Sequence, residues 1–226
     1  MNEYNIFKVL KLERKETIHS AMIAAIVAHD EKCWKHFFDM LKEKGKAKGF
    51  NIEALRTSII YDDNKNHKWI DTEVHLTEKI NGKTRDRGRA DIWIGTNNPK
   101  IKDKDKFRLI IENKIDADFQ YRQLRKYYRY LTDDESRQFA GLFVLCVKDD
   151  EEFVNKAVEA AKEFNNESKI YDDKSQKDTK YAVITYKDII SWLEQVIKDT
   201  EEGDFKTAVK QYKKIIEGFY SQKEAN

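Results

Sequence analysis

The sequence has few of the compositional features that assign a chain to a class of protein. Its 226 residues include one proline and two cysteines, and its formal net charge is only +2. A nearly balanced charge does not indicate a nucleic-acid binder, so any basic surface must come from local segregation of charge. No apolar run approaches about 18 residues and no positive, apolar leader begins the chain, which predicts neither a membrane span nor a signal peptide. We therefore expect a cytoplasmic protein.

Two further absences exclude kinds of site. There is no glycine-rich phosphate loop, which argues against an NTPase. Cys33 and Cys146 stand at no ligand-like spacing, and His19 has no second histidine or cysteine at such a spacing, so His19 is expected to be a hydrogen-bonding residue on a helix face. Cys146 lies within an apolar run and is expected to be a small core residue in a reducing compartment.

What the chain does have is enough apolar material for a core. The hydrophobic fraction is 40% and the aromatic fraction 12%, which predicts a folded globular protein. No repeat, low-complexity tract or linker divides it. We expect a single domain over residues 1–226, with a helical N-terminal part (1–50), a central part that carries the candidate site (69–147), and closing helices and a strand (148–226).

The hydrophobic period changes along the chain and predicts an α/β domain with a mixed sheet. Helical spacing is seen in Glu16–Val27, Trp34–Lys44 (ended by Gly45–Gly49), Phe119–Leu131, Glu152–Phe164, Ile189–Lys198 and Phe205–Tyr220. Strand-like patterns are seen in Trp69–Leu76, Ala90–Ile94, Phe107–Ile111, Gly141–Val147 and Tyr181–Thr185. Strands that are apolar on both faces are expected at the centre of a covered sheet.

The segment Leu109–Lys114 is the most informative in the chain. Three apolar residues end in Glu112-Asn113-Lys114, so a buried type of strand leaves the core with two opposite charges. The two-residue period of a strand puts Glu112 and Lys114 on the same side, about 6–7 Å apart along the chain. Upstream, Asp91 interrupts a second apolar strand. If the two strands pair as a hairpin with Gly95–Lys106 as the loop, Asp91 and Glu112 converge.

Two carboxylates and a lysine at a strand end suit phosphodiester hydrolysis. Hard divalent cations prefer oxygen ligands, so Asp91 and Glu112 are candidates to hold one or two Mg²⁺ ions, with Mn²⁺ as the expected substitute. A metal ion there polarises the phosphate and helps to ionise the attacking water. Lys114 is suited to positioning that water or to offsetting charge in the transition state.

This arrangement resembles the motif of the PD-(D/E)xK nuclease superfamily. The family pattern is an aspartate followed after a spacer by Glu-x-Lys. Here it is matched by Asp91, twenty intervening residues and Glu112-x-Lys114, with Ala90 at the position of the motif proline, which is often replaced in the family. The resemblance implies a restriction-endonuclease-like fold, a mixed β-sheet flanked by helices, and a metal-dependent nuclease. By position, it implies that Asp91 and Glu112 are metal ligands and that Lys114 is the catalytic lysine.

The flanking segments are similar to one uncharacterised bacterial branch of that superfamily. The run Ile-Ile-Glu-Asn-Lys-Ile is followed there by a Gln-Leu-x-x-Tyr element, matched here by Gln123 and Tyr127. An early helix carries Glu-x-x-His-Ser, matched by Glu16, His19 and Ser20. The similarity covers roughly residues 6–131, and beyond it only the alternation of helix and strand agrees. It implies that Glu16 is an additional acid near or on the metal.

Four more residues are candidates for the site. Glu73, on the strand before Asp91, is an acid within reach of the cluster. Gln123 and Tyr127 are one helical turn apart on a common face and are expected to point back toward the site and orient it. Arg89, beside Asp91, is expected to orient the site or to form an ion pair with Asp91.

Each candidate also has a simpler structural explanation. Glu112 and Lys114 would form a surface ion pair, Asp91 would be a turn residue, Glu16 would be an ordinary first-turn acid, and Glu73 would make a cross-strand charge pair. Four basic residues in the helix with Gln123 would line a phosphate track or form a solvated face: Arg122, Arg125, Lys126 and Arg129.

The sequence therefore predicts a Mg²⁺-dependent nuclease that acts on nucleic acid, with DNA preferred over RNA. Two other functions stay open: an inactive nucleic-acid or protein binding module on the same fold, and a cation-dependent hydrolase of another class. The sequence does not decide between a monomer and a homodimer, between endo- and exonuclease, or which of Glu16 and Glu73 joins the metal shell.

Overall fold

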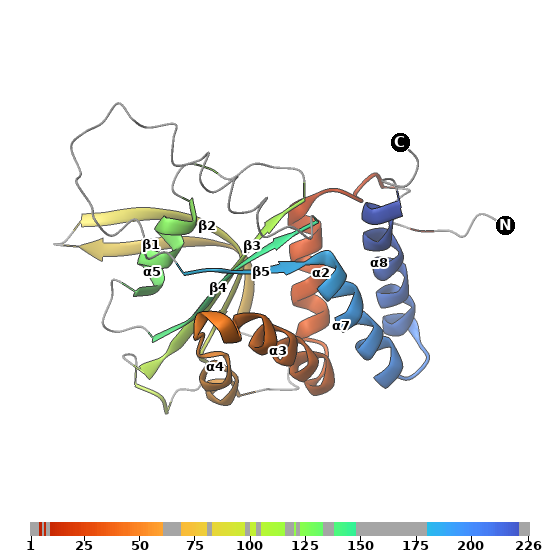
Figure 1. The fold of residues 1–226 in the computed structure, drawn as a ribbon, viewed down its shortest axis with the longest axis horizontal. Coiled ribbons are helices and arrows are strands. Elements are labelled where there is room, and N and C mark those ends of the chain that lie inside the picture. The colour runs from red at the N-terminus through yellow and green to blue at the C-terminus, as the bar shows by residue number, and fades with distance from the viewer. Residues whose placement is uncertain are drawn as a thin grey trace.

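One mixed sheet with helices on both faces forms the molecule (Figure 1). The computed structural model of the chain describes residues 5, 7, 10–60, 69–80, 83–97, 100–102, 105–115, 120, 123–132, 138–147 and 180–221. The strands are β1 (Ile70–Ile80), β2 (Lys83–Gly95), β3 (Phe107–Lys114), β4 (Gln138–Cys146) and β5 (Ala182–Thr185). The helices are α2 (Glu16–Val27), α3 (Glu31–Gly45), η1 (Lys46–Lys48), α4 (Ile52–Ser58), α5 (Gln123–Thr132), α7 (Tyr186–Asp199) and α8 (Asp204–Ser221).

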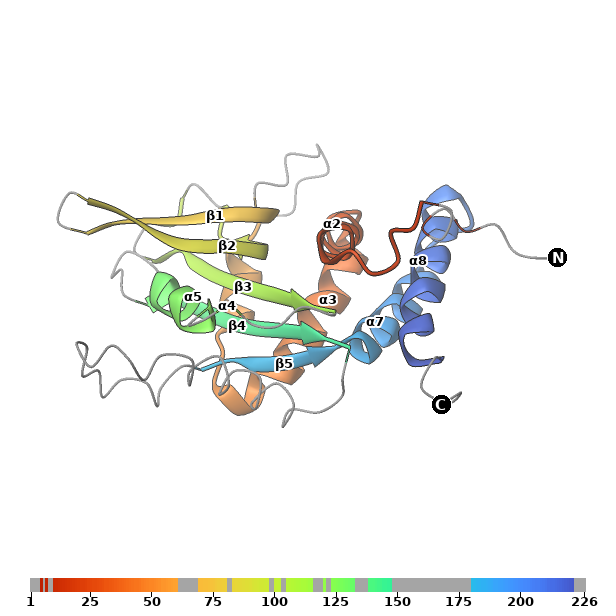
Figure 2. The same ribbon diagram turned by 90° about the horizontal axis from the view of Figure 1, so that it is seen from above.

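The strands lie in the order β1-β2-β3-β4-β5, with the first three antiparallel and the last two parallel to β3 (Figure 2). The predicted α/β class and the mixed sheet are confirmed. The strands that carry Asp91 and Glu112 pair as an antiparallel hairpin, as the sequence predicts. β2 pairs with β3 only over Ile92–Gly95, whereas it pairs with β1 over nearly its whole length. The two strands therefore continue beyond β3 as a two-stranded ribbon, drawn in yellow in Figure 1.

Some predicted elements differ from those that the structure describes. β2 begins at Lys83 rather than at Ala90, because its charged first half pairs with β1 alone and needs no apolar pattern. The predicted helix Phe119–Leu131 is described from Gln123 onward. The sequence reading missed α4, whose seven residues are too few to show a clear helical period. The predicted helix Glu152–Phe164 lies outside the described residues.

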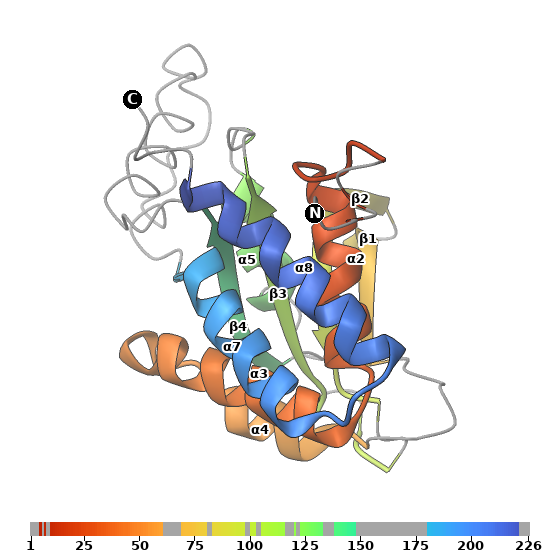
Figure 3. The same cartoon turned by 90° about the vertical axis from the view of Figure 1, so that its right-hand side faces the viewer.

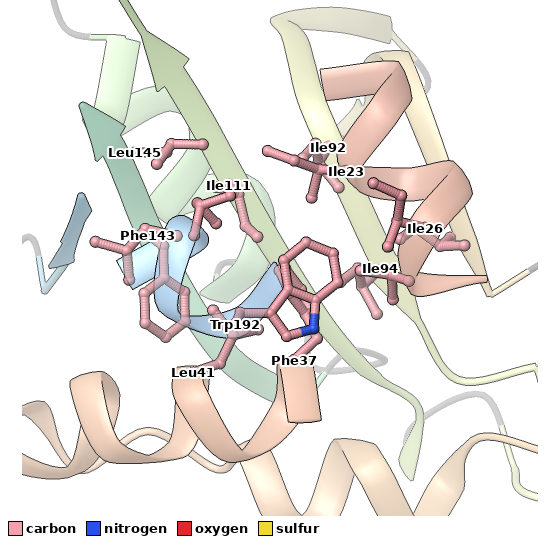
Figure 4. Packing of buried hydrophobic residues seen from close by; sticks show 14 of the residues in the cluster. Ile23, Ile26, Phe37, Leu41, Ile92, Ile94, Ile111, Phe143, Leu145 and Trp192 are labelled. Carbon is pink, nitrogen blue, oxygen red and sulfur yellow. The ribbon is translucent and has the colours of Figure 1, made fainter. Parts of the chain in front are cut away.

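Each face of the sheet has its own apolar cluster. On one face, α2, α3, α4 and α7 pack on the sheet around residues such as Ile92, Ile111 and Phe143, and α8 packs outside them against α7 (Figure 4). On the other, α5 packs on alternate residues of the same strands, among them Ile110 and Leu142. The continuous apolar runs of β3 and β4 thus arise because both faces are covered, as predicted. Cys33 and Cys146 are both buried, and neither is part of a disulfide bond.

The C-terminal helices close the face that α2 covers (Figure 3). A capping box starts α7 directly after β5: Thr185 Oγ1 accepts from the Asp188 main-chain N–H, and Asp188 Oδ2 accepts from the Thr185 N–H. This abrupt start places Tyr186, the first residue of α7, fully inside the apolar cluster. In the described part of the chain, none of the helices has the length and apolar character that a membrane crossing needs.

Candidate active site

Three acids lie in one row across the first three strands. Residues beside Asp91 pair with β1 and β3: Thr72 and Val74 pair with Ile92 and Ala90, and Ile92 pairs with Ile111. The same registers place Glu73 opposite Asp91 on one side and Glu112 opposite Asp91 on the other. The row lies where β2 separates from β3 and the ribbon leaves the sheet.

The strand alternation breaks at this row. Ala90 and Ile92 are two residues apart, yet Ala90 packs in the cluster under α5 and Ile92 in the cluster on the opposite face. Across from Asp91, Glu73 has a φ of 56°, in the left-handed region that side chains other than glycine rarely adopt. Local strain of this kind costs on the order of 1–3 kcal/mol and is enriched at functional sites.

Glu112 is the most deeply buried acid of the row, with 1% of its surface exposed. Lys114, on the same side of β3, places Nζ 2.7 Å from Oε1 of Glu112. Nε2 of Gln123 donates to the same oxygen at 2.6 Å. The other oxygen, Oε2, is buried and has no hydrogen-bond partner among the described residues. Glu112 therefore has one oxygen held by protein groups and one left bare.

The electrostatics of the row favour neutral acids and a charged lysine. Burial, reinforced by the Asp91 charge, raises the pKa of Glu112 to about 8 despite the attraction of Lys114. Burial also raises the pKa of Asp91 to about 6, against the opposing effects of a hydrogen bond from Asn113 and of Lys114. Burial lowers the pKa of Lys114, but the charges of Glu112 and its neighbours outweigh burial, so the net shift is upward. The positive charge of Lys114 is thus too little to offset the effect of burial on the pKa values of the two acids.

Two carboxylates receive the main-chain N–H groups at the end of β3. The Asn113 N–H donates to Oδ2 of Asp91 at 2.7 Å, and the Ile115 N–H donates to Oε1 of Glu16 at 2.7 Å. These N–H groups are two residues apart and lie on the same edge of β3, where β2 no longer supplies carbonyl partners. Glu16, from α2, is thereby held close enough to Asp91 and Lys114 for its charge to raise the pKa of both.

α5 reaches the row through Gln123 and Tyr127, on the helix face that the sequence predicts. Gln123 Nε2 also donates to the Tyr127 hydroxyl at 2.9 Å, and that hydroxyl donates to the main-chain oxygen of Arg89 at 2.6 Å. The ring of Tyr127 lies against Gly88, where a Cβ atom would come within 3.2 Å of Cε1. Gly88 has a φ of 106°, so glycine serves both the backbone conformation and the close approach.

The simpler alternative for Arg89, an ion pair with Asp91, is not the one that the described residues form. Arg89 Nε instead lies 2.8 Å from Oε2 of Glu73, while the other oxygen of Glu73 is buried without a hydrogen-bond partner among the described residues. In the register Arg89 is paired with His75, so Glu73 lies diagonally across the ribbon from it. The Arg89 side chain is largely exposed and is the cross-strand partner of Glu73.

Two more predicted residues lie on the other side of β3. His19 is fully buried, and its ring nitrogens lie 3.2 Å from the Tyr212 hydroxyl and 2.7 Å from the Glu13 main-chain oxygen. His19 is therefore a hydrogen-bonding residue, as expected. Ser20 contacts Asn113, a residue that the sequence reading passed over as the variable middle of the Glu112-x-Lys114 motif. One signal for Asn113 was available, because a polar residue between two charges that share one side of a strand must face the other side, toward the helices there.

The acid row fits a divalent cation. Glu112 and Glu73 each have a buried oxygen without a hydrogen-bond partner among the described residues. The pKa values of Glu112 and Asp91 are raised. A nearby positive charge would stabilise all of these groups. Carboxylate oxygens are the ligands that Mg²⁺ prefers. As the side chains of the described residues stand, no three histidine, cysteine, aspartate or glutamate residues form a ready cation site. Glu112 is instead paired with Lys114, and Glu16 with the Ile115 N–H.

Comparison with known families agrees with the motif and with the fold. The model of the PD-(D/E)XK nuclease superfamily matches residues 4–214, which is most of the chain. No curated protein sequence and no solved structure gives a significant match. The mixed sheet with N-terminal and C-terminal helices is the restriction-endonuclease-like architecture that the sequence predicts. The chain belongs to the PD-(D/E)XK nuclease superfamily.

Proposed function

We propose that the protein is a Mg²⁺-dependent nuclease that hydrolyses phosphodiester bonds in DNA. The observation that carries the proposal is the state of Glu112, a buried acid opposite Asp91 with Lys114 on one oxygen and no partner on the other. A structural ion pair needs no second acid and no bare oxygen. A site that binds a cation and a phosphate needs both.

Asp91 and Glu112 are the residues that would hold the metal ion, and Glu73 and Glu16 are the acids placed to complete its surroundings. When bound, a divalent ion would polarise the phosphate and lower the pKa of the attacking water. The Asn113 N–H already orients the Asp91 carboxylate through Oδ2. Gln123 orients the Glu112 carboxylate through Oε1, so the two carboxylates need little rearrangement to act together.

Lys114 acts as a cation next to the phosphate in this proposal. Its neighbours raise its pKa, so it stays protonated near neutral pH. A fixed ammonium beside the reacting phosphate stabilises the negative charge that develops in the transition state, or orients the attacking water. Its contact with Glu112 holds the ammonium within the acid row, which supports this role.

Cleavage of a supercoiled plasmid tests the proposal directly. We expect nicking with Mg²⁺ or Mn²⁺, occupancy without turnover with Ca²⁺, which is larger and less demanding of octahedral geometry, and no cleavage in EDTA. Lys114→Ala, purified in parallel, should be inactive, which excludes a contaminating nuclease. Lys198→Ala, which removes an exposed lysine of α7, is the matched control and should cut like the wild type.

A single-stranded RNA and a DNA of the same sequence, compared at equal concentration, distinguish the substrate class. Preferential cleavage of the RNA would replace DNA by RNA in the proposal and leave the metal chemistry intact. Full activity in EDTA, or equal activity of wild type and Lys114→Ala, would refute the metal-dependent nuclease. Binding of DNA without cleavage under all these conditions would favour the inactive binding module.

A further inference from the structure

Asn113 stands between Glu112 and Lys114 but faces the opposite side of β3. Its side chain is fully buried, and both its amide nitrogen and its amide oxygen are hydrogen-bonded. Nδ2 donates to the main-chain oxygen of Glu16 at 3.1 Å and to Oγ of Ser20 at 3.2 Å. Oδ1 accepts from the Tyr186 hydroxyl at 3.0 Å. One side chain therefore connects β3 with the first turn of α2 and the first residue of α7.

The two contacts on α2 determine where that helix begins relative to β3. Glu16 and Ser20 are four residues apart, so they are the two ends of one helical turn. Holding both ends sets the position and the rotation of the turn. Glu16 then has its carboxylate at the Ile115 N–H, beside the end of β3. Without this anchor, the Glu16 carboxylate at the Ile115 N–H would be the remaining hydrogen bond described between this turn and β3, and apolar packing specifies direction poorly.

An asparagine at this place is costly if packing is its only role. A buried amide loses its hydration and regains stability only when every donor and acceptor is satisfied. An apolar residue of similar size would fill the same space between β3, α2 and α7. Directional bonds, by contrast, admit one arrangement of the three elements. The polar choice makes sense where a neighbouring side chain must be held within a narrow range of positions.

We propose that Asn113 is a positioning residue, whose side chain fixes the first turn of α2 on β3 and thereby holds the Glu16 carboxylate beside Asp91 and Lys114. Tyr186 supports it by holding Oδ1 from α7. The role of Glu16 in the acid shell rests on the proposed function. The hold of Asn113 on Glu16 rests on the contacts alone, so the two parts can be tested apart.

Exchange of the Ile115 amide hydrogen reports the hold without any metal or substrate. In Asn113→Ala the Glu16 carboxylate should lose its fixed position, so the Ile115 amide should exchange about tenfold faster or more. Tyr186→Phe keeps the buried ring and removes one hydroxyl, and should speed exchange less, by about threefold. If Asn113→Ala does not fold, Tyr186→Phe decides. Ser58→Ala is the matched control. It removes a buried hydroxyl from α4, which is hydrogen-bonded to Leu55 O and to the Thr96 hydroxyl.

The second readout is the site itself. Asn113→Ala should weaken Mn²⁺ binding in calorimetry and lower kcat, each by about tenfold, while KM for DNA stays unchanged. Ser58→Ala should lower the melting temperature and change neither quantity. Unchanged Ile115 exchange in folded Asn113→Ala and Tyr186→Phe would overturn the proposal. Faster exchange with unchanged Mn²⁺ affinity would overturn the link to the acid shell. If the variants show the faster exchange but the wild type has no nuclease activity, the proposed function fails and the positioning role stands.

Discussion

Lys114 Nζ lies 2.7 Å from Oε1 of Glu112, two residues away on the same strand. Both groups are buried: the side chains are 12% and 2% exposed. A buried pair of this kind gives up hydration on both partners, and its attraction only partly compensates. Here the pair does not neutralise the site, because burial and Asp91 still hold the pKa of Glu112 at about 8. This imbalance is the basis of the predictions that follow.

The lysine variant and the acid variants should lose cleavage for different reasons, which their metal binding distinguishes. Lys114→Ala should keep Mn²⁺ binding in calorimetry and lose cleavage by about 10²–10³-fold, because the lost interaction is worth most in the transition state. Asp91→Ala and Glu112→Ala should lose both metal binding and cleavage. The acid variants should remain folded, since each relieves repulsion between acids. Normal cleavage by Lys114→Ala, together with unfolding of an acid variant, would show a structural ion cluster instead.

The metal-free protein should become less stable as the pH rises toward about 8. The folded state keeps a proton on Glu112 up to a pKa of about 8, whereas the unfolded chain loses it in the ordinary carboxyl range. The folded state therefore binds more protons between these values, and linkage lowers stability with rising pH. The melting temperature in EDTA should fall between about pH 5 and pH 8.

Glu112→Gln is the variant that isolates this effect. Its side chain cannot lose a proton, so most of the fall in melting temperature should disappear, with Asp91 accounting for the remaining part up to its pKa of about 6. Saturating Mg²⁺ should offset the fall in the wild type, because a bound cation favours the ionised acids. An identical pH dependence in wild type and Glu112→Gln would contradict the raised pKa.

Gln123→Ala should reduce cleavage by about 10–100-fold, the usual effect of losing a group that orients a metal ligand. Nε2 of Gln123 donates to Glu112 at 2.6 Å, and this bond is lost. The fold should survive, because Gln123 is only half-buried at the start of α5. Gln195→Ala, an exposed glutamine of α7, provides the control in the same kinetic assay. Wild-type kcat in Gln123→Ala would leave this contact without a functional role.

Glu73→Gly should separate stability from activity. Glycine adopts the φ of 56° without strain, so the backbone should gain about 1 kcal/mol in chemical denaturation. The same change removes an acid beside Asp91, so cleavage and Mn²⁺ affinity should fall. Glu73→Gln keeps the strained backbone and removes only the charge. If Glu73→Gly retains full activity, the acid is a cross-strand partner of Arg89 and nothing more.

Local sequence pattern predicted the parts of the site that lie on one strand or one helix face. The two-residue period placed Glu112 and Lys114 on the same side of β3, and the ion pair confirms that placement. The one-turn spacing of Gln123 and Tyr127 placed both on one face of α5, and their hydrogen bond confirms it. The apolar runs of β3 and β4 predicted a covered sheet. Each of these follows from geometry that repeats along the chain.

Partners that come together from distant segments depended on the tertiary structure. Arg89 pairs with Glu73 rather than with its neighbour Asp91, because the alternation of the ribbon breaks at the acid row. The period of a strand says which residues share a face but does not reveal where one residue in the left-handed region reverses the faces. Likewise, nothing in the local pattern identified α4 or the length of β2.

The sequence by itself determined the family and the class of fold and predicted the residues of the motif, because apolar periods and charged strand ends are local features of the chain. Only the tertiary structure decided that Glu112 keeps one oxygen bare, that Glu16 reaches the Ile115 N–H, and that Asn113 joins β3 to α2 and α7. Those contacts join residues from opposite ends of the chain. Burial and directional hydrogen bonds arise only when those ends meet, and they decide which charges the site leaves uncompensated.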